Sequence, residues 1–122
     1  MRVRNALPAV FVGLALAALA TGCGSSRRSA AIHGPPPLKT PAEKQGEVLF
    51  MRFCHQCHPH GSGGLGPGLN NKPAPAAAIR LQIREGMGAM PAFGKDEIKD
   101  PEVDAIIAYM LAIRSYESEA DD

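Results

Sequence analysis

The sequence predicts an all-α domain of three to four helices. Apolar residues recur at spacings of three and four in separate segments, which is the period of a helix with one buried face. No segment alternates apolar and polar residues as a half-buried strand does. The 122 residues include 13 Gly and 11 Pro, which indicates long irregular connections between the helices. This length allows a single domain.

Three helices are expected, over about residues 42–54, 76–85 and 101–116. Gly86 ends the second helix, as glycine commonly does just beyond a helix C-terminus. Asp100 is the expected N-cap of the last helix, because a proline follows it at the first helical position. The expected buried faces are Gly46, Leu49, Phe50 and Phe53, then Ala76, Ile79 and Ile83, and finally Val103, Ile106, Ile107, Met110 and Ile113.

Residues 1–22 are interpreted as a bacterial lipoprotein signal peptide. Two arginines precede an apolar run, from Leu7 to Ala20, that is too short to span a bilayer comfortably. The sequence Leu19-Ala20-Thr21-Gly22-Cys23 resembles a lipobox, after which Cys23 would become the lipidated first residue. Cleavage after Ala20 would instead leave Cys23 as an unpaired thiol. Because such a thiol is a liability in an oxidising compartment, lipidation is favoured.

The remainder of the chain is expected to contain a tether, a domain and a tail. Residues 23–41 hold the lipidated cysteine and a Gly/Ser/Pro-rich tether that cannot build a core and could extend roughly 55 Å. Residues 42–116 form the domain, and residues 117–122 form a polar tail. The formal net charge of +1 gives no case for nucleic-acid binding, which usually needs a strongly basic domain.

The segment Cys54-His55-Gln56-Cys57-His58 is a C-x-x-C-H motif, the signature of covalent haem attachment. Its two thiols, three residues apart, can each add to one vinyl group of the haem. The next residue, His58, then points its imidazole at the iron. One covalent haem c is therefore the predicted cofactor. A porphyrin would also supply the apolar volume that a domain of this size lacks on its own.

Three other chemistries share this cysteine pattern. A zinc site would need two more ligands at a separate spacing, and the chain has no second cysteine pair. A thioredoxin-like dithiol needs a βαβ context that this sequence does not predict. A simple disulfide would leave the adjacent His58 without a role. Each is therefore less favoured than haem attachment.

From about Ala42 to Ser115 the chain resembles the class I cytochromes c. Gly46 and Phe50 stand eight and four residues before Cys54. At these positions the family packs its first helix against an aromatic residue of its last helix, which here would be Tyr109. The resemblance implies the class I cytochrome c fold, with three to four helices around one covalently bound haem.

The resemblance also implies the residues around the iron. Gly66-Pro67-Gly68-Leu69 matches the family's Gly-Pro loop, in which the Pro67 carbonyl accepts a hydrogen bond from His58 and raises its basicity. Met90-Pro91 matches the loop of the axial methionine, so that His58 and Met90 are the implied iron ligands. Met87 is the competing methionine. Met90 is preferred because a proline follows it and a phenylalanine stands two residues further on.

Ligation by histidine and methionine would fill both axial positions of the iron, which suits electron transfer and not bond chemistry. The predicted function is that of a non-enzymatic one-electron carrier in a respiratory or dehydrogenase chain. We expect a monomer whose partners are a dehydrogenase, an oxidase or another cytochrome. One alternative is a haem c enzyme, or a gas or redox sensor, with a labile sixth ligand, although the sequence has no convincing distal acid or base. Another is a cytochrome subunit of a dehydrogenase or oxidase complex.

The lipid on Cys23 would anchor the protein on the periplasmic side of a bacterial membrane. The outer membrane is favoured because Gly24 stands where an aspartate often retains lipoproteins in the inner membrane. Charge is uneven along the chain, since residues 96–122 are mainly acidic. We predict a dipole, with the acidic last helix behind the haem, that steers an acidic partner to the haem edge. The basic residues of this dipole are Arg52, Lys72, Arg80, Arg84 and Lys95.

Overall fold

The computed structural model describes residue 32 and residues 34–114. This part of the chain contains three α-helices, one short 3-10 helix and no strand, which confirms the all-α prediction. The elements are α2 (Pro41–Phe53), η1 (Pro59–Gly61), α3 (Ala76–Glu85) and α4 (Asp100–Arg114). The proposed signal peptide, Cys23 and the tail at 117–122 lie outside the described residues.

Helix α2 begins with a capping box. The side chain of Thr40 accepts a hydrogen bond from the Glu43 N–H at 3.2 Å, and the Glu43 carboxylate accepts one from the Thr40 N–H at 2.9 Å. Hydrogen bonds from the backbone N–H groups of Thr40 and Lys39 hold the pKa of Glu43 below its usual value. Pro41 occupies the first turn, where its missing N–H costs nothing. The helix therefore starts one residue earlier than expected.

Helix α4 differs from its prediction at the first residue. Asp100 was expected as the N-cap, but it lies inside the helix. The Lys99 N–H is accepted by the Glu102 carboxylate at 2.7 Å, so this glutamate satisfies the backbone at the helix start. The Asp100 carboxylate instead bonds Arg84 at 2.7 Å and Lys95 at 3.0 Å. These two hydrogen bonds, that from Lys95 first, hold the pKa of Asp100 below its usual value.

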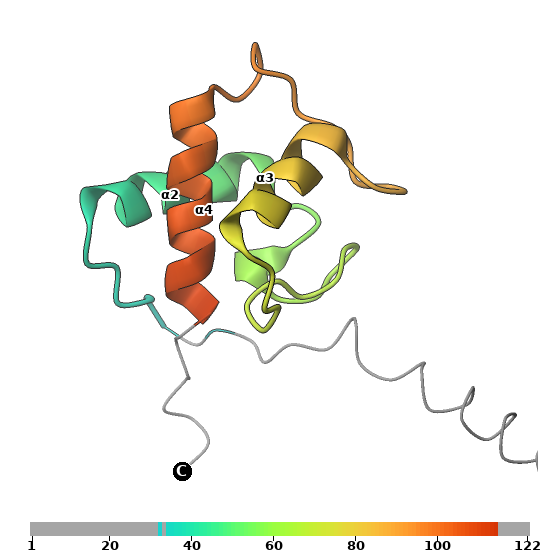
Figure 1. The fold of residues 1–122 in the computed structure, drawn as a ribbon. Coiled ribbons are helices and arrows are strands. Elements are labelled where there is room, and N and C mark those ends of the chain that lie inside the picture. Colours follow the sequence, from blue (N-terminus) through green and yellow to red (C-terminus); the bar gives the residue numbers. More distant parts are fainter. Residues whose placement is uncertain (1–31, 33, 115–122) are drawn as a thin grey trace, which may run out of the picture.

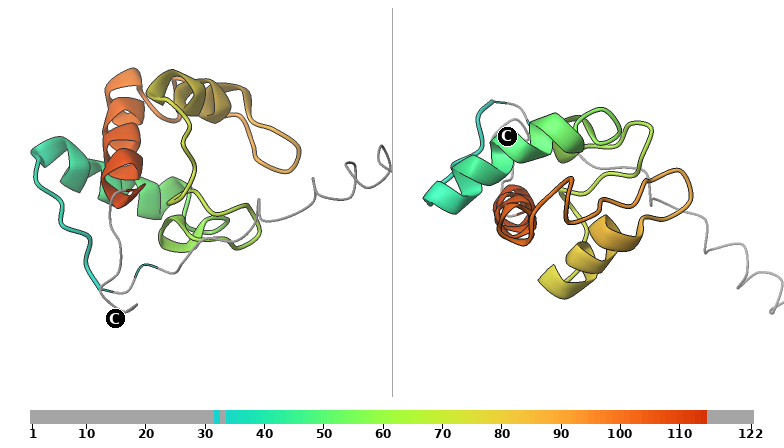
Figure 2. Two further views of the ribbon diagram at one scale, coloured as in Figure 1. Left: turned by 60° about the horizontal axis from the view of Figure 1, so that its bottom comes forward. Right: turned by 90° about the horizontal axis from the view of Figure 1, so that it is seen from above.

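The core is centred on the crossing of α2 and α4 (Figure 1). Phe50 and Tyr109 meet there with ring centroids 5.1 Å apart, the pairing that the resemblance implied. Gly46 permits the close approach, because a Cβ built on it would lie 1.9 Å from the Ala105 carbonyl oxygen. Seen from above, α4 stands end-on between α2 and α3 (Figure 2). The buried apolar residues are Leu49, Phe50, Ile79, Ile83, Ile98, Val103, Ala105, Ile106, Ile107, Tyr109, Met110 and Ile113.

Part of the predicted tether belongs to the domain. Residues 23–41 were expected to build no core, yet Ile32 and Leu38 are half-buried and pack against it. Burying their aliphatic side chains is favourable, and this gain offsets the entropy of ordering the backbone beside them. The stretch between Cys23 and the packed part of the chain is therefore shorter than expected.

Candidate haem-binding site

The C-x-x-C-H motif occupies the turns that follow α2. The Cys54 N–H bonds the Phe50 carbonyl at 2.8 Å, and the His58 N–H bonds the Cys54 carbonyl at 2.9 Å. This winding continues the helix for one further turn and brings both thiols and the imidazole close together. Both cysteines are half-buried, and they are not joined to each other by a disulfide. Before a haem is attached, burial, with a smaller effect from Cys57, raises the pKa of the Cys54 thiol to about 12.

His58 is the one buried polar side chain among the described residues, with 7% of its surface exposed. Its Nδ1 lies 2.8 Å from the Pro67 carbonyl oxygen. Because a carbonyl only accepts, Nδ1 must carry the proton, and Nε2 is left with a lone pair for a metal. The structure thus holds this histidine in the tautomer that a haem iron requires.

Gly66 is the residue that lets the Pro67 loop reach His58. A Cβ at this position would lie 2.3 Å from His58 Cε1 and 2.8 Å from Nδ1, far inside van der Waals contact. The loop is closed on the other side by the Gly66 N–H, which bonds the Cys57 carbonyl at 2.9 Å. Backbone groups therefore fix the imidazole on the side away from the metal position.

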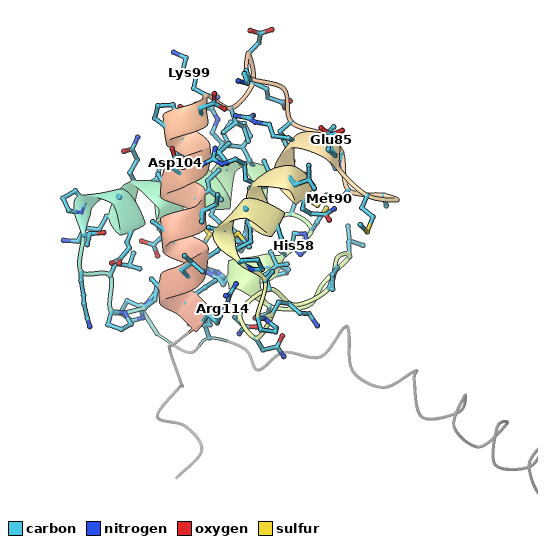
Figure 3. The ribbon with its side chains drawn as sticks, viewed as in Figure 1. His58, Glu85, Met90, Lys99, Asp104 and Arg114 are labelled. Carbon is cyan, nitrogen blue, oxygen red and sulfur yellow. The ribbon has the colours of Figure 1, made fainter. Side chains whose placement is uncertain are left out.

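The two candidate methionines lie in different surroundings. Met87 and Met90 form a two-residue antiparallel bridge, in which each N–H bonds the other's carbonyl at 3.0–3.1 Å. The Met87 side chain is 73% exposed, whereas Met90 is half-buried and packs against the core. Met90 Sδ accepts a hydrogen bond from Gln82 Nε2 at 3.7 Å. Figure 3 shows His58 and Met90 on the same side of α4, close to α3.

Sequence reasoning missed Gln82 and the role of Arg84. Gln82 stands directly before Ile83, which is one of the buried residues of α3, and Gln82 itself is half-buried. This position in the helix was the only sequence signal that Gln82 faces the site. The side chain of Arg84 binds carbonyl groups of the segment that follows Met90. Carbonyl acceptors carry no sequence signature, so no motif could have indicated these bonds.

The predicted charge dipole is wrong in one respect, because the acidic residues of α4 do not lie behind the basic ones. Three of the five basic residues pair with carboxylates at the start of α4. Arg80 bonds Asp104, and both Arg84 and Lys95 bond Asp100. A fourth, Arg52, lies with its guanidinium carbon 5.0 Å from the centre of the Phe53 ring. Two of the five positive charges are therefore compensated locally by carboxylates of α4.

The donor set fits a covalent haem better than the alternatives. It provides two thiols for the vinyl groups, an imidazole with a free Nε2 and a half-buried thioether. Within the described part of the chain, no group of three or more His, Cys, Asp or Glu side chains could hold a metal such as zinc. His55 and His60 pack against each other, with ring centroids 4.6 Å apart, and His55 Nδ1 accepts the His60 N–H. None of the described helices is long and apolar enough to span a bilayer.

Sequence relationships agree with the fold and the site. Residues 41–110 match the family model described as cytochrome C oxidase, cbb3-type, subunit III. The chain therefore belongs to the class I cytochrome c family, whose members are electron-transfer proteins and not enzymes, and it carries covalent haem c. Cys54 and Cys57 fit the haem-attachment motif of this family.

Several curated proteins are similar to this chain. The cytochrome c subunit of 4-cresol dehydrogenase [hydroxylating] from Pseudomonas putida is 31% identical over 68 residues, which cover 56% of this chain and 59% of that one. Cytochrome c6 of a Synechocystis species is 35% identical over 74 residues, which cover 54% and 61%. Cytochrome c6 of Rippkaea orientalis is 31% identical over 94 residues, which cover 70% and 80%. The chain thus spans about six-tenths of the first two relatives.

Proposed function

We propose that this protein is a periplasmic, membrane-anchored monohaem cytochrome c that carries single electrons in a respiratory or dehydrogenase chain. Electron transfer by haem c follows from the family. The anchor and the compartment rest on the lipobox-like segment that ends at Cys23 and on haem attachment outside the cytoplasm. The proposed layout is a signal peptide over 1–22, a lipidated tether over 23–41, a domain over 42–116 and a tail over 117–122.

The proposed iron ligands are His58 and Met90, with thioether bonds from Cys54 and Cys57. The observation that carries this assignment is the 2.8 Å contact of His58 Nδ1 with Pro67, because it leaves Nε2 for the iron. Met90 is favoured over Met87 because its sulfur is directed into the domain and meets Gln82. The haem, when bound, supplies a single redox centre that gains or loses one electron.

The surrounding residues favour a centre whose geometry changes little between the two redox states. The Pro67 carbonyl fixes the orientation of His58, and the Gln82 amide bonds the Met90 sulfur. Both interactions are hydrogen bonds between uncharged groups, so neither partner gains or loses a charge when the charge of the centre changes. If His58 and Met90 both bound the iron of a haem held here, no position would remain for substrate, which favours the carrier over an enzyme or a sensor.

The expected docking surface for redox partners lies on the loops that hold the two ligands. The most exposed large apolar side chains of the described residues are Leu65, at 86%, and Met87, at 73%. Leu65 is next to Gly66, which touches His58, and Met87 is bridged to Met90. A short-lived contact through these two side chains would bring a partner close to the proposed ligands on both sides.

The test of this function is the visible spectrum of the holoprotein in both redox states. A sharp α band in the reduced form, with the weak far-red band of an iron–methionine bond in the oxidised form, is expected. The far-red band should disappear in Met90→Ala and remain in Met87→Ala. An α band without any far-red band would overturn methionine ligation and favour the enzyme or sensor, and a haem-free protein would overturn the whole assignment.

A dehydrogenase subunit is the second candidate function. It is favoured by the similarity to a protein described as a dehydrogenase cytochrome c subunit. The two candidates differ in how the protein is found in its source, because a subunit co-purifies stoichiometrically with a larger partner and a carrier does not. Sedimentation of the detergent-solubilised native protein distinguishes them.

Labelling with radioactive palmitate, which Cys23→Ser should abolish, tests the anchor.

A further inference from the structure

Arg84 binds the segment that follows Met90 at four points. Its side chain is only 15% exposed. One terminal nitrogen, Nη1, donates to the carbonyl groups of Phe93 at 2.9 Å, Gly94 at 3.2 Å and Ile98 at 2.8 Å. The other, Nη2, bonds the Asp100 carboxylate at 2.7 Å. A single side chain of α3 thus connects residues 93–100 to the helix.

The guanidinium is suited to this task by its shape. It is a rigid planar fork whose donors point in fixed directions, so four acceptors bound together define one arrangement of the chain. A lysine side chain has a single nitrogen, so it cannot hold the carbonyl groups through one nitrogen and the Asp100 carboxylate through another, as the two terminal nitrogens of Arg84 do. Ile98 is fully buried. If its carbonyl lost the bond from the Arg84 guanidinium, bulk water would not replace that hydrogen bond.

The Met90 loop is closed at both ends by consecutive residues of α3. At its start, the Gly86 N–H donates a hydrogen bond to the Gln82 carbonyl. Gly86 adopts a φ of +67°, and a Cβ at this position would lie 2.5 Å from the Met90 carbonyl oxygen. At its end, the Phe93 N–H bonds the Ile83 carbonyl at 2.9 Å. Arg84 is the next residue on the helix and binds the carbonyl of that same Phe93. The loop that presents the Met90 sulfur is therefore held shut at its base.

We propose that Arg84 is the positioning residue that keeps the Met90 loop closed and so sets how readily the methionine leaves the iron. This inference rests on the proposed ligation by Met90. Phe93 and Gly94 form the base of the loop that carries Met90, so opening the loop at its base breaks the bonds of Arg84 to their carbonyl groups. Without the guanidinium the loop opens more often, and a small exogenous ligand competes better for the sixth position. Arg84 thus separates a closed electron carrier from a protein with an accessible iron.

Imidazole binding to the oxidised holoprotein tests the proposal, because imidazole replaces the methionine only after the loop opens. In Arg84→Ala the association rate should rise at least about tenfold, the change expected when opening no longer breaks a charged hydrogen bond. Arg80→Ala is the matched control. It removes an ion pair one turn earlier on the same helix, where the Arg80 guanidinium bonds Asp104 of α4 and not the loop. Its rate should equal that of the wild type.

Two further variants separate the carbonyl bonds from the ion pair. Asp100→Asn keeps the three carbonyl acceptors and should bind imidazole at nearly the wild-type rate. Arg84→Lys keeps the charge and should bind faster. If Arg84→Ala does not accumulate as holoprotein, hydrogen exchange in Arg84→Lys remains decisive. The Phe93 amide should then exchange faster, while the amides at the crossing of α2 and α4 should not.

The outcomes distinguish this proposal from the assignment on which it rests. Wild-type rates and a wild-type far-red band in Arg84→Ala would overturn the role of Arg84 and leave ligation by Met90 intact. A far-red band that persists in Met90→Ala would overturn the ligation, and this inference with it. Equal acceleration in Arg80→Ala and Arg84→Ala would show a general loosening of α3, which also overturns the proposal.

Discussion

The crossing of α2 and α4 should not accept a side chain at Gly46. In Gly46→Ala, the new Cβ would lie 1.9 Å from the Ala105 carbonyl oxygen and 2.8 Å from Tyr109 Cβ. The nearest atom belongs to the backbone of a helix, so it cannot rotate aside as a flexible side chain would. To restore an ordinary contact, the two helices must separate by more than ~1 Å, because well-packed carbon atoms lie about 3.5–4.0 Å apart.

That separation has a cost that can be bounded. A gap of about 0.5–1 Å already forfeits a quarter to a half of the dispersion energy across a packed surface. Overpacked cores lose about 1–3 kcal/mol, and a backbone clash belongs at or above the upper end of this range. Alanine regains up to about 1 kcal/mol through its higher helix propensity. We therefore expect Gly46→Ala to lower the free energy of unfolding by about 2–3 kcal/mol.

The assay is guanidinium unfolding of the holoprotein, followed by far-ultraviolet circular dichroism. Gly94→Ala is the matched control, because a Cβ there meets no atom within 4 Å and the residue needs no positive φ. Its unfolding free energy should stay the same or rise by up to about 1 kcal/mol, since alanine restricts the unfolded chain. If Gly46→Ala behaved like Gly94→Ala, the helices would not be in the close contact argued above.

Three further changes probe other parts of the domain. In Gly66→Ala the new Cβ displaces the His58 ring, weakens its bond to the Pro67 carbonyl and lowers its basicity, so the reduction potential should rise in a redox titration. An unchanged potential would contradict this coupling. Thr40→Ala removes the cap of α2 and should cost about 1 kcal/mol in guanidinium unfolding, with Thr40→Ser close to wild type. Burial, with a smaller effect of Glu47, raises the pKa of Tyr109 to about 12. The folded state holds the Tyr109 proton more tightly than the unfolded state does. The stabilisation that this gives the folded state is complete below about pH 10 and is lost as the pH rises through about 12. Tyr109→Phe should therefore flatten the alkaline fall of the guanidinium midpoint, and a parallel fall in both proteins would refute the assignment.

Local signals in the sequence predicted the helices well. Helix α3 occupies residues 76–85 as expected, because Pro75 precedes it and Gly86 ends it through its own backbone preference. The start of α4 was predicted less well, since Asp100 has the chemistry of an N-cap but is bound by Arg84 and Lys95. Neither Arg84 nor Lys95 belongs to a helix-capping motif. Only the fold brings their side chains to the Asp100 carboxylate. The same is true of Leu38, which is buried by a surface that the tether composition could not predict.

The candidate site divides in the same way. The C-x-x-C-H motif is contiguous, so its residues were identified without knowledge of the fold. The choice between Met87 and Met90 depended on the resemblance, through the proline that follows Met90, and only the structure shows that Met87 is exposed and Met90 half-buried. Gln82 and Arg84 act through a sulfur and backbone carbonyl groups, which are contacts that no residue pattern encodes. Sequence therefore indicated the proposed haem ligands, and the structure indicated which groups position their side chains.

The pairing of charges around α3 changes what should control encounter with a partner. Five basic residues near the site would make electron transfer with an anionic reagent strongly dependent on salt. Arg80, Arg84 and Lys95 are, however, paired with two carboxylates of α4, those of Asp100 and Asp104, which offset two of the five positive charges locally. Raising the salt concentration should therefore slow oxidation of the reduced holoprotein by ferricyanide. The rate should fall by less than it would if all five positive charges were unpaired. A cationic cobalt complex should show a similarly weak dependence.

The apolar side chains on the two ligand loops should matter more than charge for a protein partner. Leu65 is the most exposed large apolar residue described and stands beside Gly66, so Leu65→Asp places a charge at the proposed contact without entering the core. Val48→Asp is its matched control, since Val48 is also exposed but lies on α2. Electron transfer to the native partner should slow in the first variant and not in the second. A steep salt dependence of this rate, with no effect of Leu65→Asp, would show that the predicted charge dipole controls docking and that the apolar side chains do not.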